Sequence, residues 1–261
     1  MTTRLGVLVV VLCPLWTGAG AASAQTAPDD PSAAPTEARS PAKPARATWK
    51  LLTDILNDFR HLPSADTAEV LEAGGGLALA ARPADHRLNV RLDGDPWVHT
   101  VFAPGNVVGC GATQIGLAVA TVAWGRQHEQ PKVVHLGGDL LRAQVVTDVL
   151  TLGVKEAVQR TRPDGGRLSF PSGHASVTFA SATVLERHLG WRAAVPAYLV
   201  ASYVAASRLH DNRHYLSDVV FGAAIGIAAG RTVTRHGRHT WTMMPAAMPG
   251  GMVVRVSRVG R

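Results

Sequence analysis

The chain has 261 residues, of which 46% are hydrophobic and 17% charged, and it carries a formal net charge of +7. This length is enough for one domain with a substantial core. The basic residues are scattered and lack a recognition motif, which argues against nucleic acid as a partner. An anionic substrate or an anionic membrane surface explains the charge better.

The first 24 residues have the order typical of a secretory signal peptide. Arg4 precedes an apolar run over residues 5–15, and the small residues 22–24 follow it. Because this run is too short to span a bilayer, we expect cleavage before Gln25 and export, with the periplasm as the expected compartment. A retained membrane anchor is the alternative.

Residues 25–47 are dominated by alanine, proline and small polar residues. Such a segment cannot bury enough apolar surface to become ordered, so we expect a disordered linker and a folded domain that starts at residue 48. Cys110 is the only cysteine after the leader, which excludes an intramolecular disulfide.

Apolar residues recur at helical spacing over residues 51–62, before Pro63. Asp66 and Glu69 resemble a capping box that opens a second helix, which we expect the glycines at 74–76 to interrupt. Residues 105–124 are uncharged and long enough to be a transmembrane candidate. Their polar side chains and four glycines make insertion marginal.

Helical periodicity continues over residues 139–160, 172–188 and 217–231. The apolar runs at 193–206 and 219–230 are only 14 and 12 residues long, which suits buried helices of a bundle. We therefore predict an all-α fold, with a helical domain over residues 48–232. For the C-terminal extension, residues 233–261, a β-hairpin that pairs 241–244 with 252–256 and a loose tail are both open.

Lys155 and Arg162 form the first block of residues that can carry chemistry. They are seven residues apart, so their side chains leave the same helical face as long as the helix persists. Pro163 is expected to end the helix and to push Arg162 toward an extended conformation that swings the guanidinium inward. Two such cations taken alone are more often a solvated face.

Pro171-Ser172-Gly173-His174 forms the second block. Ser172 is a good N-cap, and Gly173 lets the backbone come close to a ligand. A helix start presents unpaired N–H groups and the positive end of the dipole, which together attract an anion. His174 is then expected beside that anion, although an ordinary capped helix with a surface histidine is as good an explanation of this block alone.

The third block consists of Ser207-Arg208, His214 and Asp218. The spacing of four places the Asp218 carboxylate on the same helical face as the His214 imidazole. The carboxylate can then accept one ring N–H and leave the other nitrogen free to act as a nucleophile.

Together the three blocks resemble the signature of the type 2 phosphatidic acid phosphatase superfamily, which includes bacterial class A nonspecific acid phosphatases and vanadium haloperoxidases. That signature reads Lys-x6-Arg-Pro, Pro-Ser-Gly-His and Ser-Arg-x5-His-x3-Asp. The matching positions are Lys155, Arg162, Pro163, Pro171, Ser172, Gly173, His174, Ser207, Arg208, His214 and Asp218. The gap of seven residues between Pro163 and Pro171 is shorter than in many relatives, which puts substrate selection by a lid-like loop in doubt.

The resemblance implies the helical bundle of that superfamily and a phosphatase that works through a phosphohistidine, with no metal or other cofactor. His214 is the implied nucleophile, Asp218 orients it, and His174 protonates the leaving group and then activates water. The implied phosphate-binding residues are Lys155, Arg162, Ser172, Gly173 and Arg208.

Three alternatives remain open at this point. The first is a vanadate-dependent haloperoxidase on the same fold. The second is a zinc hydrolase, because His210 and His214 have the spacing of a zinc-binding helix. The third is an inactive protein that binds phosphate or a lipid headgroup. The substrate is a phosphorylated lipid or a soluble phosphate ester, peripheral contact with a membrane is consistent with the charge, and the sequence does not indicate an oligomeric state.

Overall fold

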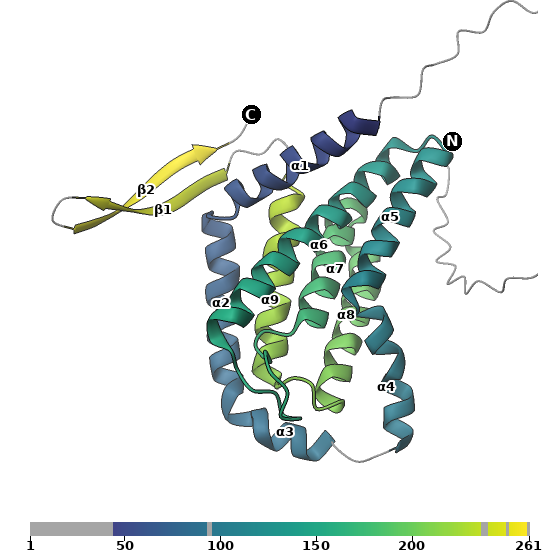
Figure 1. The fold of residues 1–261 in the computed structure, drawn as a ribbon, viewed down its shortest axis with the longest axis vertical. Helices are drawn as coiled ribbons and strands as arrows, with labels where there is room; N and C mark the ends of the chain where they lie inside the picture. Colours follow the sequence, from purple (N-terminus) through teal and green to yellow (C-terminus); the bar gives the residue numbers. More distant parts are fainter. Residues whose placement is uncertain (1–43, 93–95, 236–239, 249–250, 260–261) are drawn as a thin grey trace, which may run out of the picture. The chain divides into compact units, whose positions relative to one another are not determined.

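The computed structural model describes residues 44–92, 96–235, 240–248 and 251–259 (Figure 1). The expected leader, residues 1–24, and most of the expected linker, residues 25–47, lie outside these ranges. The elements are α1 (Pro44–His61), α2 (Ala65–Ala81), the 3-10 helix η1 (Arg82–Ala84), α3 (Asp85–Leu92), α4 (Pro96–Val108), α5 (Gly111–Gln127), α6 (Pro131–Val158), α7 (Gly173–Leu189), α8 (Trp191–His210), α9 (Leu216–Val233), β1 (Thr240–Met248) and β2 (Gly251–Val259). The helical bundle confirms the predicted all-α domain.

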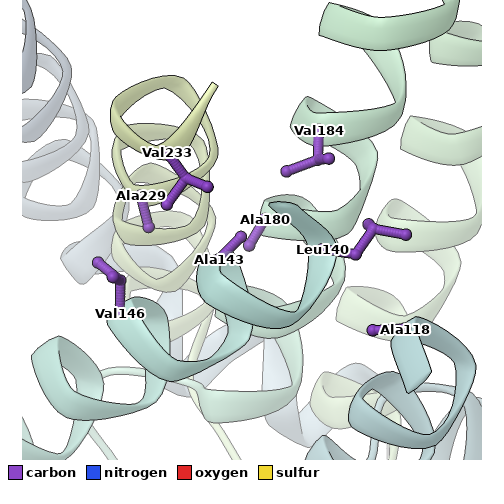
Figure 2. Close-up of a cluster of buried hydrophobic side chains, with 8 residues drawn as sticks. All are labelled: Ala118, Leu140, Ala143, Val146, Ala180, Val184, Ala229 and Val233. Atoms are coloured by element: carbon purple, nitrogen blue, oxygen red, sulfur yellow. The ribbon is translucent and has the colours of Figure 1, made fainter. Parts of the chain in front are cut away.

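Helix α7 lies at the centre of the bundle and packs against α6, α8 and α9 (Figure 1). Helix α5 packs against α6, and α2 against α9. The main apolar cluster lies between α5, α6, α7 and α9 (Figure 2) and consists of Ala118, Leu140, Ala143, Val146, Ala180, Val184, Ala229 and Val233. Half of these side chains are alanine, so the helix axes can approach closely and still fill the space between them.

Helix α2 differs from the expectation at both its start and its middle. Its N-cap is Ser64, whose Oγ accepts a hydrogen bond from the backbone N–H of Thr67 at 3.3 Å, rather than a capping box of Asp66 and Glu69. The helix also continues through the glycines at 74–76. Gly74 lies directly against Ala224 of α9, and this packing holds the helix where propensity alone would break it.

The uncharged segment 105–124 does not form one continuous helix. It is broken between α4 and α5, where the two helices are bent by 54°. Gln114 is buried in the bundle, and both ends of its amide have partners there. Its Nε2 donates to the carbonyl oxygen of Val108 at 2.7 Å, and its Oε1 accepts from Ser181 at 2.7 Å. Helix α9, and the bent pair taken together, are each long and apolar enough to cross a membrane, and 67% of the α9 segment is buried within the bundle.

The C-terminal extension contains the hairpin that the sequence left open against a loose tail. Strands β1 and β2 pair antiparallel, in a register from Thr240 opposite Val259 to Met248 opposite Gly251. Both strands are longer than the segments 241–244 and 252–256 that the apolar pattern predicted.

Candidate active site

The predicted site residues come together at the end of the bundle where α6 and α8 end and α7 and α9 begin (Figure 1). Two connecting segments, 159–172 and 211–215, complete this end. Helix termini and loops, rather than helix faces, therefore supply most of the functional side chains.

His214 lies in the segment before α9 and is 4% exposed, while Asp218 is in the first turn of α9 and fully buried. The expectation that the two residues share a helical face is wrong, because α9 begins only at Leu216. Instead, Asp218 Oδ2 accepts the backbone N–H of Tyr215 at 2.9 Å, and this turn brings His214 Nδ1 to 3.6 Å from the same oxygen. That separation is longer than a hydrogen bond, and it leaves Nε2 as the ring nitrogen that faces away from the carboxylate.

The carboxylate of Asp218 is held in its charged form. Burial by itself would raise the pKa of Asp218, but contacts with His214, Ser169, the Tyr215 N–H and Arg160 outweigh burial and hold the pKa below its usual range. Arg160 Nη1 donates to Oδ1 at 2.7 Å, and the Ser169 hydroxyl donates to Oδ2. A buried negative charge therefore stands behind the His214 imidazole.

Arg160 is a functional residue that the sequence analysis missed. Its Nη1 donates to Ser217 Oγ at 2.7 Å as well as to Asp218, its Nη2 donates to Asp85 Oδ2 at 2.9 Å, and its guanidinium lies 4.0 Å from the centre of the Tyr215 ring. Asp85 in turn accepts the backbone N–H of Ser217 at 2.9 Å. The proximity of Arg160 to Arg162 was the only signal in the sequence, because Asp85 lies 75 residues away.

His174 lies in the first turn of α7 and contacts Asn106, another residue that the sequence analysis did not select. His174 Nε2 is 3.2 Å from Asn106 Oδ1, which also accepts a hydrogen bond from Arg208 Nη1 at 3.0 Å. An amide oxygen only accepts, so in this arrangement Nε2 of His174 carries the hydrogen. Burial, with help from the charge of Arg208, lowers the pKa of His174 to about 4.

Burial also lowers the pKa of the His214 imidazole, with Lys155 and Arg162 adding to the effect and Asp218 opposing it. Both histidines are therefore neutral near pH 7 before a substrate binds. A neutral imidazole whose Nδ1–H faces a carboxylate has its lone pair on Nε2, which is the form required of a nucleophile.

Three cationic side chains lie around the two histidines. Arg208 is 4% exposed and its Nη2 donates to Asp211 at 2.6 Å, while Lys155 Nζ donates to the Leu168 carbonyl oxygen at 2.6 Å. Burial, reinforced by Arg162, lowers the pKa of Lys155 to about 8. The buried Nε of Arg162 has no hydrogen-bond partner among the described residues, which leaves it able to bind an anion.

The expectation that Lys155 and Arg162 leave one helical face is also wrong. Helix α6 ends at Val158 because Gln159 adopts a left-handed conformation with φ 48°, four residues before Pro163. Arg162 lies in a tight turn, in which its backbone N–H donates to the Gly166 carbonyl oxygen at 2.8 Å. This turn, rather than helical periodicity, directs Arg162 toward the site.

The start of α7 has the geometry expected of an anion site. Ser172 is the N-cap, its Oγ accepts the backbone N–H of Ala175 at 3.5 Å, and its own N–H donates to the Asp218 carbonyl oxygen at 2.9 Å. A methyl group added to Gly173 would meet only Thr151, at 3.9 Å, so protein atoms leave space beside this glycine. Gly222 supports the turn from α9, where a methyl group would lie 2.6 Å from the Ser172 carbonyl oxygen.

The zinc hydrolase alternative gains no support from the geometry. His210 is the last residue of α8, and its ring packs against Phe102, with 5.4 Å between the ring centres. The three-ligand cluster found in the described part of the chain contains neither His210 nor His214.

A cavity of about 410 Å³ lies next to the site. It shares Arg160 and Ser217 with the network around Asp218, and its other lining residues are Gly75, Ala78, Leu79, Arg82, Val158, Phe170 and Phe221. None of the predicted catalytic or phosphate-binding residues lines this cavity.

Part of the chain is similar to known proteins. Residues 159–241 match the model of the PAP2 superfamily. A lipid A 1-phosphatase of Porphyromonas gingivalis is 45% identical over 29% of this chain and 18% of its own length. A decaprenylphosphoryl-5-phosphoribose phosphatase of Mycobacterium tuberculosis is 36% identical over 34% of this chain and 54% of its own length.

The chain thus spans only about a fifth to a half of the length of these two relatives. Among solved structures, the crystal structure of Aquifex aeolicus LpxE is 21% identical, with a TM-score of 0.48 over 58% of this chain and 95% of that one.

Proposed function

We propose that this chain, which is similar to the PAP2 superfamily over residues 159–241, is a phosphatase that hydrolyses phosphomonoesters or diphosphates through a phosphohistidine. The observation that carries this proposal is the pairing of a buried, neutral His214 with a buried, charged Asp218 beside three cations. Such a site supplies a nucleophile and a matching charge for a phosphoryl group.

In the proposed first step, Nε2 of His214 attacks phosphorus while the bond to the leaving oxygen breaks. Asp218 stabilises the positive charge that develops on the ring. His174 gives its proton to the leaving alkoxide. A bound phosphate brings negative charge next to His174, and this favours the protonated imidazole that the step requires.

In the proposed second step, neutral His174 takes a proton from water, the water oxygen attacks phosphorus, and the P–N bond to His214 breaks. Lys155, Arg162 and Arg208 hold the phosphoryl oxygens throughout, with the N–H groups at the start of α7. These cations supply charge of the kind that many phosphoryl-transfer sites take from metal ions, so we propose that the reaction proceeds without one.

For the substrate we propose a phosphorylated lipid, reached from the membrane surface. The two relatives described above are named for lipid substrates. Large apolar side chains are also exposed on the outer faces of two helices, with Leu117 on α5 at 57%, and Trp191 and Leu199 on α8 at 71% and 66%. A peripheral contact with lipid would cover such side chains.

The proposed domain organisation follows the sequence: a leader at 1–24, a linker at 25–47, the phosphatase domain at 48–232 and an extension at 233–261. Helix α1 begins at Pro44, so the last four residues of that linker are helical. The leader leads us to propose export to the periplasm.

The decisive experiment compares turnover of p-nitrophenyl phosphate, phosphatidic acid and a polyprenyl diphosphate by the chain that lacks residues 1–24. We expect turnover of all three, with kcat/KM highest for a lipid in mixed micelles. A preference for the soluble ester would overturn the lipid assignment alone. Phosphate binding without turnover would favour the inactive binder, and halide oxidation that requires added vanadate would favour the haloperoxidase.

A further inference from the structure

A second cluster of ionisable side chains lies at the opposite ends of α6 and α7. His135 and Asp139 are one turn apart on α6, and His188 lies in the last turn of α7. One potential ligand atom from each of the three side chains lies within 4.8 Å of the other two. Asp139 precedes Lys155 by 16 positions, so about 24 Å of helix separates this cluster from the candidate active site.

The geometry of the cluster is close to that of a metal site with two imidazoles and one carboxylate. Ligand atoms about 2.0–2.1 Å from a tetrahedral zinc ion lie roughly 3.4 Å apart, and two imidazole rings on one such ion have centres about 5 Å apart. Here His188 Nε2 is 2.8 Å from Asp139 Oδ2, and the ring centres of His135 and His188 are 5.4 Å apart. Small rotations of the side chains would therefore admit an ion.

Asp139 is already held in the orientation that a ligand needs. Arg142 Nη2 contacts its Oδ1 at 3.0 Å, which leaves Oδ2 on the side of His188. Metal-binding carboxylates are commonly oriented in this way by a partner that does not touch the metal. Asp139 is 2% exposed whereas His135 is exposed, so an ion could reach the buried carboxylate from solvent.

The surrounding charges also favour an added cation. Arg142 faces three carboxylates, since its guanidinium lies 3.3 Å from Asp58 and 3.8 Å from Asp54 in addition to its contact with Asp139. Lys50, whose side chain is 77% exposed, contacts Asp54 from solvent. Arg142 is thus shared among three carboxylates, and a divalent ion bound to Asp139 would add a further positive charge to this group.

We propose that His135, Asp139 and His188 bind a divalent transition-metal ion, for which zinc is the best match, with water completing the coordination. Imidazole and carboxylate ligands suit zinc, and its tetrahedral preference fits three ligands from two helices. Arg142 also donates to the Val233 carbonyl oxygen at 2.8 Å, so the ion would link α6 and α7 and, through Arg142, brace α1 and α9. Its role is structural and separate from phosphoryl transfer.

The test is a calorimetric titration of the untagged, chelator-treated full chain with zinc chloride in a buffer without phosphate. We expect one equivalent to bind and the melting temperature to rise. At free zinc 100 times the Kd, the unfolding equilibrium constant should fall about 100-fold. Cobalt(II) should occupy the same site and give the intense visible bands of a tetrahedral ion.

Two variants identify the ligands. His135→Ala removes an exposed ligand without disturbing the core, and His188→Gln keeps a hydrogen bond to Asp139 while removing the imidazole. Each should weaken zinc binding by more than about tenfold and abolish the cobalt bands, with phosphatase activity unchanged. His128→Ala, in the nearby α5–α6 connection, and His174→Ala, in the candidate active site, should both keep the full equivalent. Wild-type protein that binds no zinc, or binding unchanged in both ligand variants, would overturn the proposal.

Discussion

The two ends of α6 and α7 contain the same kinds of side chain in different arrangements. At the far end, Arg142 lies on a helix face among Asp54, Asp58 and Asp139, so its charge is compensated. At the active-site end, Arg162 comes from a loop and Arg208 from a helix terminus. Among the described residues, the buried Nε–H of Arg162 has no hydrogen-bond acceptor. The charge of Arg142 therefore stabilises the fold, whereas Arg162 keeps a hydrogen-bond donor available to a ligand.

The active-site end also contains compensated pairs, among them Arg208 with Asp211 and Arg160 with Asp218. The pair of Arg160 and Asp218 differs from the far-end cluster because Asp218 also faces His214, the proposed nucleophile. An ion pair that stabilises the fold thus also sets the charge behind a reactive group. The substitutions below separate the effect of such charges on stability from their effect on catalysis.

The largest effect should come from His214→Ala. Removal of the proposed nucleophile should lower kcat by about 10⁴-fold or more, while the buried position tolerates the smaller side chain with only modest destabilisation. Single-turnover assays with acid-quenched detection of a phosphoenzyme would check this. Arg213→Ala, an exposed residue in the same segment, serves as the control and should change kcat less than about threefold. A phosphoenzyme that persists in His214→Ala would show that another residue is the nucleophile.

Arg160→Met and Arg142→Met test the comparison directly. Each removes one guanidinium from buried carboxylates, and we expect each to destabilise the fold by about 3 kcal/mol. Only Arg160→Met should also lower kcat, by about 100-fold, because Asp218 then loses a partner that keeps its pKa low.

Urea unfolding gives the stability of both variants, and the pH profile of kcat/KM separates the two roles. With Arg160 absent, the pKa of Asp218 rises, so the acidic limb of the profile should move to higher pH. A profile that keeps its wild-type shape would mean that Arg160 acts on the fold alone.

A third test asks whether catalysis depends on close packing at the active-site end. Gly222→Ala would place a methyl group 2.6 Å from the Ser172 carbonyl oxygen and push the start of α7 away from α9. A shift of that size in a phosphate-binding turn should lower kcat about 10-fold to 100-fold. Gly153→Ala is the control, because a methyl group there meets nothing within 4 Å. It should stabilise α6 by about 0.5–1 kcal/mol and leave kcat unchanged.

The sequence predicts which residues come together better than it predicts the local structure that positions them. All eight predicted residues lie at one end of the bundle. They could be selected because their spacing forms a recognisable signature. The predicted helical spacing was wrong for Lys155 with Arg162 and for His214 with Asp218. Arg162 lies in a turn closed by Gly166, and His214 lies in the turn before α9. Such turns leave no periodic signal in the sequence. Asn106 and Arg160 were missed because their partners are distant in the sequence.

The same reasoning explains the parts of the fold that were predicted less well. Apolar periodicity located α7, α9 and most of α6, since each buries a continuous face. It failed at the glycines of α2 and at the break between α4 and α5. There the outcome depends on contacts such as Gly74 with Ala224 and Gln114 with Ser181, which tertiary packing alone creates.

The smallest effect concerns pH. Lys155 has a pKa of about 8, lowered mainly by burial, so its positive charge is lost as the pH rises through that value. If Lys155 holds a phosphoryl oxygen, kcat/KM should fall several-fold between pH 7 and 9, because this ratio reports the free enzyme. Lys155→Arg keeps the charge at alkaline pH and should remove that decline, at the cost of a lower plateau from its different geometry. An alkaline limb that is identical in Lys155→Arg would mean that another group titrates there, and Lys155 would then serve only to fix the Leu168 turn through the carbonyl oxygen that it contacts at 2.6 Å.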